Sequence, residues 1–251
     1  MTPPAAGPVS GLPPVPLPGR PVEVVFHPLA RPADALAADA ALLSAAERAR
    51  AGRFRVAEAR NRFVAARAAL RRCLAARLGT DPAMLPLLDG PWGKPRLADP
   101  DAAARLSFNL SHSGDWAAIG LAAGPAPPDI GVDIEATRRL DDLDGMARLA
   151  FHSREAEAWH AVPAAERPAD FYRRWTRKEA VMKAVGLGFH LAPHGFALED
   201  AGAGEAILAA STDPRAPAGG IGVADLAVPV PEMAGAVALV GARPIPRTVS
   251  P

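Results

Sequence analysis

Two carboxylates in a short β-branched run are the first residues of this sequence whose types and spacing could do chemistry. Asp133 and Glu135 alternate with large aliphatic side chains in the run at residues 130–135. In a strand, residues two apart share one face and lie about 6.8 Å apart, so Val132 and Ile134 point into a core. Like charges that close repel unless a cation or proton lies between them. The pair therefore predicts a divalent metal site, with a solvated edge strand as the alternative.

A second pair of chemical interest lies on a predicted core helix at residues 171–186. Glu179 and Lys183 are four residues apart beside its apolar stripe, and Gly186 is a natural helix end. The ordinary interpretation is a helix ion pair worth about 0.3–0.5 kcal/mol. However, the chain has only three lysines against 25 arginines. A lysine here indicates a position that needs a compact ammonium able to give up a proton, which a guanidinium cannot do.

Three motifs in a fixed order carry a resemblance to a known family. They are FNLSHSGD at residues 108–115, GVDIE at residues 131–135 and WTRKEAVMKA at residues 175–184, preceded by GKP at residues 93–95. Over roughly residues 22–200 the chain resembles 4′-phosphopantetheinyl transferases of the surfactin-synthetase-activating type. The resemblance implies transfer of the 4′-phosphopantetheine moiety of coenzyme A to a serine of an apo acyl or peptidyl carrier protein, with release of 3′,5′-ADP. Such carriers serve fatty acid, polyketide or nonribosomal peptide biosynthesis.

The same resemblance implies residues that bind coenzyme A. Lys94 matches the lysine of the G-K-P motif, which the family associates with the cofactor's phosphates. Ser111 and His112 match positions that contact the nucleotide phosphates, although a histidine at a turn is, on spacing alone, usually just hydrated. Arg50 and Arg67 lie where the family places positive charge near coenzyme A, and we expect one of them to contact the 3′-phosphate.

The chemistry of the metal site can be argued from the residues themselves. Asp133, Glu135 and Glu179 are hard ligands without Cys or His among them, and they match magnesium (Mg²⁺), or Mn²⁺, rather than zinc. Magnesium bridges carboxylates to phosphate oxygens, which indicates a pyrophosphate substrate such as coenzyme A. Glu179 is a candidate metal ligand, general base for the serine proton, or both. Lys183 is expected to neutralise or protonate the leaving phosphate.

The elements that must position these residues can be predicted from periodicity and turn signals. In the first half we expect a strand at residues 22–26, a basic amphipathic helix over residues 47–78 with Ser44 as its cap and a break near Gly52, and strands at residues 106–110 and 116–121 joined by a polar hairpin tip at residues 111–115. In the second half we expect the acidic strand, helices near residues 142–150, 153–161 and 164–186, and short strands near residues 196–199, 206–210, 222–227 and 234–240.

Both halves are therefore predicted to be α+β. The resemblance implies two similar halves related by a pseudo-twofold, each a small antiparallel sheet packed with helices, with the cofactor in the cleft between them. We expect a disordered Pro-rich extension at residues 1–20, an N-terminal half at residues 21–128, a C-terminal half with the metal site at residues 129–245, and a tail at residues 246–251. The net charge is +5 up to Pro128 and −4 from Asp129 onward, so the halves differ in the charges they bring to the cleft.

Two other function classes stay open on the residues alone. Residues 47–78 hold ten arginines against two glutamates, which is typical of a solvated face or of a nucleic-acid binding module, but aromatic residues for base stacking are few. The other alternative is a different metal-dependent phosphoryl-transfer enzyme. Neither class needs all three motifs, so we expect no nucleic-acid partner.

Composition bounds the remaining expectations. No stretch of the sequence approaches the eighteen or so apolar residues that a membrane span needs, and the single cysteine, Cys73, excludes an internal disulfide. We therefore expect a cytoplasmic protein without a membrane partner. Because both predicted halves are present in one chain, the resemblance implies a monomer.

Overall fold

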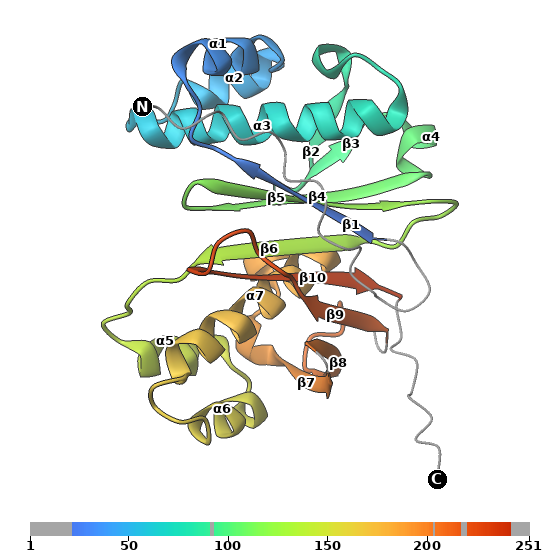
Figure 1. Ribbon diagram of the computed structural model, residues 1–251. Helices are drawn as coiled ribbons and strands as arrows, with labels where there is room; N and C mark the ends of the chain where they lie inside the picture. Colours follow the sequence, from blue (N-terminus) through green and yellow to red (C-terminus); the bar gives the residue numbers. More distant parts are fainter. Residues whose placement is uncertain (1–21, 91–92, 203, 217–219, 242–251) are drawn as a thin grey trace.

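Two antiparallel β-sheets lie face to face, and each carries a long helix on its outer side (Figure 1). The computed structural model describes residues 22–90, 93–202, 204–216 and 220–241. The predicted extension at residues 1–20 and the predicted tail at residues 246–251 lie outside these ranges. Among the helices within them, none is long and apolar enough to cross a membrane.

The first sheet has the strand order β1-β5-β4. Its strands are β1 (Val22–Pro28), β4 (Leu106–Ser113) and β5 (Trp116–Ala123). Around it lie α1 (Ala33–Ala41), α2 (Ala45–Ala51), the long α3 (Ala57–Leu78), the 3-10 turn η1 (Pro82–Met84) and α4 (Pro100–Ala103), with a separate hairpin of β2 (Leu87–Asp89) and β3 (Pro95–Leu97). Leu70 and Leu74 of α3 share a buried core with Ile119 and Leu121 of β5, which holds the helix on the sheet.

The second sheet has the order β6-β10-β9-β8-β7. Its strands are β6 (Ile130–Ala136), β7 (Phe196–Gly202), β8 (Glu205–Ser211), β9 (Ile221–Asp225) and β10 (Met233–Val240). The helices are α5 (Leu143–Ala150), α6 (Ser153–His160) and the long α7 (Arg167–Val185), followed by the 3-10 turns η2 (Gly188–His190) and η3 (Pro193–Gly195). Val181 and Ala184 of α7 share a buried core with Val223 and Ala238 of this sheet.

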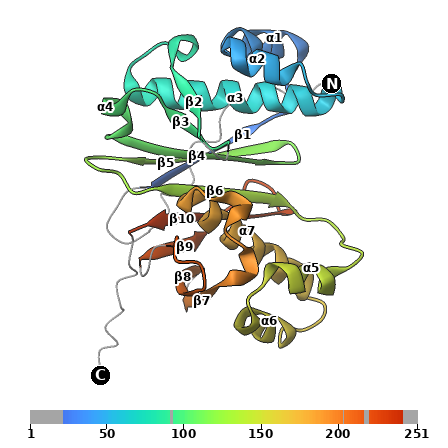
Figure 2. The same ribbon diagram turned by 180° about the vertical axis from the view of Figure 1, so that it is seen from behind.

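The two halves repeat one order of connection. In each, a first strand is followed by the long helix, a two-stranded hairpin and two further strands: β1-α3-β2-β3-β4-β5 and β6-α7-β7-β8-β9-β10. The first strand pairs with the last in both halves, and the last pairs with the one before it. Figure 2 shows the same layers from behind. The predicted α+β class is therefore confirmed, and the repeated order is what a pseudo-twofold relation between similar halves requires.

Several predicted helix ends are confirmed by their local chemistry. The Ser44 side chain accepts a hydrogen bond from the Glu47 amide, and the Glu47 carboxylate accepts one from the Ser44 amide, so a capping box starts α2. This helix ends at the predicted break, where Gly52 caps it. Gly186 caps α7 in the left-handed conformation with φ 79°, which glycine adopts without steric cost.

The predicted polar hairpin tip was wrong in its extent. β4 and β5 stay paired up to Ser113 and Trp116, so only Gly114 and Asp115 form the turn. Gly114 has φ 56°, as a tight hairpin requires. Ser111 and His112 therefore lie inside a strand rather than on a loop. The polar character of this strand end has another cause, because its side chains bond to the neighbouring sheet.

The two faces of β6 have different neighbours. Val132 and Ile134 are 0% and 1% exposed, and they pack with Phe26 and Ala118 of the first sheet in the core between the two sheets. Their predicted core position is confirmed. The opposite face of β6 meets α7, and there Gly131 lets the helix backbone come close.

β6 is an edge strand of its sheet, but three of its outward-facing amides are hydrogen-bonded. Three side chains of β4 bond to the amides that point away from β10. These bonds are Val132 N to Asn109 Oδ1 at 2.8 Å, Ile134 N to Ser111 Oγ at 3.4 Å, and Ala136 N to Ser113 Oγ at 3.0 Å. The acids of β6 consequently do not lie on a wet edge, which corrects the alternative of a solvated strand.

We expect Gly131→Ala to destabilise the fold strongly. A Cβ atom at Gly131 would lie 1.9 Å from the Ala180 carbonyl oxygen and 2.4 Å from the Ala184 amide nitrogen, so α7 would have to move off the sheet. Overpacking of this kind costs about 1–3 kcal/mol, and contact with backbone places it at the upper end. Gly52→Ala is the matched control, because its Cβ meets nothing closer than 3.6 Å.

Urea denaturation of the two variants checks this prediction. The Gly52→Ala midpoint should stay at or slightly above that of the wild type, because Gly52 has φ −65°. Equal midpoints for the two variants would contradict the close approach of β6 and α7.

Candidate active site

Side chains from β4, β6 and α7 converge where the two sheets meet. The Lys183 ammonium donates hydrogen bonds to Asp133 Oδ1 at 2.5 Å and to Ser111 Oγ at 3.0 Å. The Ser111 hydroxyl in turn donates to Asp133 Oδ1 at 2.9 Å. Glu179 Oε2 lies 3.9 Å from the same ammonium, one helical turn earlier on α7. The structure thus brings together four of the residues singled out from the sequence, and they come from both halves.

Burial makes negative charge costly in this cluster. Asp133 is 2% exposed, and burial raises its pKa, although the Lys183 charge and hydrogen bond act against that rise. Burial and the neighbouring Asp133 charge raise the pKa of Glu179 to about 7. A carboxyl group whose pKa lies near neutral pH is suited to taking up and releasing a proton.

Glu135 lies at the outer end of the same face of β6. Its carboxylate accepts a hydrogen bond from the Ser113 hydroxyl at 2.7 Å, and its side chain is half-buried. The negative charge of Glu135 contributes to the raised pKa values of both Asp133 and Glu179. The three carboxylates therefore interact electrically, as their sequence pattern indicated.

The chemistry of these carboxylates fits a hard divalent cation. All three offer oxygen donors, and Asp133 Oδ2 is buried without a hydrogen-bond partner. Among the described residues, no three His, Cys, Asp or Glu side chains form a ready-made metal site. Mg²⁺ needs only one or two protein carboxylates when waters and substrate phosphates complete its shell. The donor set therefore suits Mg²⁺ bound together with a phosphate substrate.

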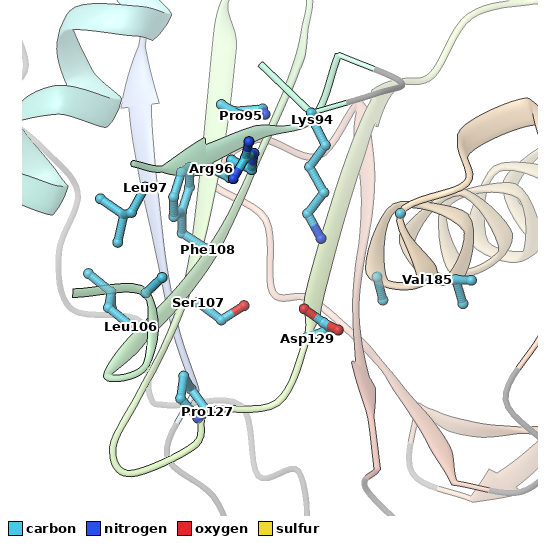
Figure 3. Close-up of a pocket in the computed structure, with 14 residues that line it drawn as sticks. Lys94, Pro95, Arg96, Leu97, Leu106, Ser107, Phe108, Pro127, Asp129 and Val185 are labelled. Atoms are coloured by element: carbon cyan, nitrogen blue, oxygen red, sulfur yellow. The ribbon is translucent and has the colours of Figure 1, made fainter. Parts of the chain in front are cut away.

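The Lys94 side chain connects the first half to the second by hydrogen bonds. Its ammonium donates to the Ile130 carbonyl at 3.0 Å and to the Lys183 carbonyl at 2.8 Å. Burial lowers the pKa of Lys94. Figure 3 shows this side chain running past the end of β6 above Asp129, at the rim of a cleft of about 320 Å³. Arg96 and Ser107 also line that cleft, so a charged ligand could enter beside Lys94.

The two predicted phosphate contacts from β4 do not lie together. Ser111 is buried in the cluster with Asp133, whereas His112, the next residue of the strand, points to the opposite face and is exposed. Partial desolvation and then the Lys183, Arg50 and Arg62 charges lower the pKa of His112. His112 therefore belongs to the basic side of the first half.

The two predicted arginines differ in their surroundings. Arg50 is exposed on α2, and its guanidinium lies 5.3 Å from the Phe63 ring centroid. Arg67 is buried on α3, with Asp89 Oδ1 at 3.3 Å and Glu47 Oε1 at 3.7 Å from its guanidinium. Burial lowers the pKa of Arg67, and both carboxylates oppose this effect. Part of the arginine excess is thus an internal ion-pair network rather than an open patch for nucleic acid.

Some residues that hold the site were not singled out from the sequence. Asn109 and Ser113 bond the edge of β6, and Lys178 is fully buried, with its ammonium 2.6 Å from Glu155 Oε2 and bonded to the Pro193 and Phe196 carbonyls. Asn109, Ser111 and Ser113 alternate along β4 and therefore share one face of it, and this pattern was a signal for Asn109 and Ser113. Lys178 is one of the three lysines of this arginine-rich chain and lies in the motif at residues 175–184, but its partners are distant in the sequence and could not be inferred from it.

Comparisons with known proteins identify the relatives of this chain. The model of the 4′-phosphopantetheinyl transferase superfamily matches residues 129–220, and a model described as 4′-phosphopantetheinyl transferase, N-terminal, matches residues 31–125. The chain is 41% identical to the 4′-phosphopantetheinyl transferase HetI of Nostoc sp. over 161 residues, which are 64% of this chain and 67% of that protein.

Two further relatives are more distant. A putative 4′-phosphopantetheinyl transferase of Synechocystis sp. is 36% identical over 59% of this chain and 58% of its own length. A phosphopantetheinyl transferase of Thraustochytrium sp. is 35% identical over 62% of this chain and 54% of its own length. This chain therefore spans a little over half of these two relatives. Together with HetI and the two family models, they show that the chain belongs to the 4′-phosphopantetheinyl transferase superfamily.

Proposed function

We propose that this protein transfers the 4′-phosphopantetheine moiety of coenzyme A to a serine of an apo acyl or peptidyl carrier protein, with Mg²⁺ dependence and release of 3′,5′-ADP. The observation that carries the proposal is the convergence of Asp133, Glu179, Lys183 and Ser111 at the junction of the two halves. Family membership supplies the reaction class. The motif resemblance further supports the surfactin-synthetase-activating type, a cytoplasmic location and a monomer.

In the proposed reaction, the carrier serine oxygen attacks the phosphorus on the pantetheine side of the pyrophosphate. The bond from that phosphorus to the bridging oxygen breaks, and 3′,5′-ADP leaves with the electron pair. Glu179, a carboxylate of the same cluster, takes the serine proton. The protein needs to form no covalent intermediate, because such transfers depend mostly on positioning the reactants and on neutralising charge.

Positive charge comes from several side chains of the cleft. Lys183 neutralises the leaving phosphate, since an ammonium is a compact charge with three donors. Asp133, Glu135 and Glu179 would hold Mg²⁺, which when bound supplies positive charge to the pyrophosphate. Arg50 is proposed to contact the 3′-phosphate. The remaining predicted contacts to coenzyme A are assigned to Arg67, Lys94, Ser111 and His112.

The first prediction is the activity itself. Intact-mass analysis of an apo carrier mixed with this protein, coenzyme A and Mg²⁺ should reveal addition of one phosphopantetheinyl group, and a chelator should abolish it. Fatty-acid, polyketide and nonribosomal-peptide carriers should be tried in parallel. An unchanged mass for every carrier class with metal present would refute the proposed function.

A second prediction separates the acidic residues from Lys183. Glu179→Gln and Lys183→Ala should lower kcat by about a hundredfold or more with little change in coenzyme A binding, because both act on groups whose charge changes during the reaction. Asp133→Ala should also weaken the metal-dependent binding of coenzyme A. Calorimetric titration of coenzyme A with and without Mg²⁺, beside steady-state rates, measures both effects. Glu157→Gln, an exposed carboxylate of α6, is the matched control.

The result for Lys183 is decisive for its role. A Lys183→Ala protein with a near-normal turnover rate would remove this residue from the mechanism.

A third prediction concerns the 3′-phosphate. Arg50→Ala should raise the KM for coenzyme A about tenfold and leave that for dephospho-coenzyme A nearly unchanged, because the two cofactors differ only in that phosphate and a charged hydrogen bond is worth about 1.5–3 kcal/mol. Arg60→Ala, an exposed arginine on the adjacent helix α3, is the control. Arg67→Ala should lower the melting temperature in addition to weakening coenzyme A binding, because its guanidinium also pairs with Glu47 and Asp89. Equal losses on both cofactors in Arg50→Ala would place the phosphate contact elsewhere.

A further inference from the structure

The Lys183 ammonium lies where the oxygen ligands of a cation converge. Within the described residues, it contacts Asp133 Oδ1 of β6 at 2.5 Å and Ser111 Oγ of β4 at 3.0 Å, and it lies 3.9 Å from Glu179 Oε2 of its own helix. These oxygens come from three elements that are distant in the sequence. A lysine side chain usually extends its charged end into solvent, so this inward position calls for a specific reason.

Charge balance supplies the reason. Asp133 and Glu179 lie 2.5 Å and 3.9 Å from the same ammonium, and Glu135 adds a third carboxylate on the face of β6 that carries Asp133. One lysine is the cation that contacts this group, and it forms ion pairs with both Asp133 and Glu179. Even so, Asp133 Oδ2 stays without a hydrogen-bond partner. The cluster therefore has one positive charge against three carboxylates, and Asp133 Oδ2 could accept a further cation.

The two sides of this contact differ in their freedom to move. The strand that carries Asp133 is fixed by β10 on one edge and by the side chains of β4 on the other. Lys183 has a flexible four-carbon stem, and its side chain is 27% exposed. A cation that arrives at Asp133 can therefore displace the ammonium, whereas the carboxylate stays in place.

We propose that Lys183 is the resident counter-cation of this carboxylate cluster, and that a divalent cation must displace the Lys183 ammonium from Asp133 in order to bind. This inference rests on the metal-binding part of the proposed function and goes beyond it, because it gives Lys183 a role before any substrate is present. Displacement frees the ammonium for the phosphate of coenzyme A. The metal affinity of the empty enzyme is thus set in part by a lysine that is not a ligand.

The test uses the full chain without coenzyme A and with Mn²⁺ as the probe. Free Mn²⁺ is measured by electron paramagnetic resonance, and melting temperatures are recorded in chelator and in saturating Mg²⁺. Lys183→Met should bind Mn²⁺ at least tenfold more tightly than the wild type. It should also melt at a lower temperature in chelator and gain more from Mg²⁺, because its carboxylates lack a partner until the metal binds.

Lys94→Met is the matched control. Its ammonium is partly buried at the junction, and it bonds to the backbone carbonyls of Ile130 and Lys183 instead of to carboxylates. This variant should lose stability and keep a Mn²⁺ affinity within about twofold of the wild type. The double variant Asp133→Asn with Lys183→Met completes a cycle, in which the gain from Lys183→Met should disappear once Asp133 carries no charge.

The outcomes separate the two proposals. If Mn²⁺ binds but Lys183→Met leaves its affinity unchanged or weaker, the counter-cation role is overturned, while the metal site stands. A gain that persists in the Asp133→Asn background, or an equal gain in Lys94→Met, would mean a general charge effect and would also overturn it. If none of the proteins binds Mn²⁺, both this inference and the proposed metal site fail, and transfer measured by carrier mass then decides the rest of the proposed function.

Discussion

The hydrogen bonds along the outer edge of β6 are the constraint on which the rest of this structure depends. A buried edge strand leaves a row of backbone amides without partners, and each unpaired amide costs about 1–3 kcal/mol. Here side chains replace a neighbouring strand, because Asn109, Ser111 and Ser113 project from one face of β4 and meet alternate amides of β6. The sheets are therefore joined in one register, and the same strand that is joined carries the acids.

Ser111 takes part both in the hydrogen bonds that connect β4 to β6 and in the candidate active site. Its oxygen accepts from the Ile134 amide and from Lys183 while its hydroxyl donates to Asp133. Any slip of one sheet along the other by two residues would break this set together with the amide bonds. Register between the halves and geometry of the site are thus fixed by the same contacts. Val132 and Ile134 pack between the sheets, and their apolar burial stabilises the contact between the two halves.

Local chemistry explains which features were predictable from the sequence. The acidic strand, the capping box at Ser44 and the end of α7 at Gly186 each depend on neighbouring residues, and all three are confirmed. The extent of β4 was not predictable in this way, because its polar end is explained by bonds to β6. The burial of Arg67 and the partners of Lys178 likewise depend on contacts between distant segments. Composition alone suggested that such residues lie on the surface or take part in the reaction, whereas the fold uses them to connect distant segments.

The three lysines show why an arginine-rich chain keeps a few ammonium groups. Lys94 and Lys178 each bond to two backbone carbonyls at points where segments from different elements meet. In both places one ammonium nitrogen donates to two carbonyls, as its three N–H groups allow. Lys183 uses the same compact charge against a carboxylate and a hydroxyl instead. Carbonyl partners cannot be exchanged without opening the fold, and the carboxylate partner of Lys178, Glu155, is buried like the lysine itself. The Lys183 side chain is partly exposed and contacts a carboxylate, so of the three lysines it is the one that we expect to change partners during a reaction.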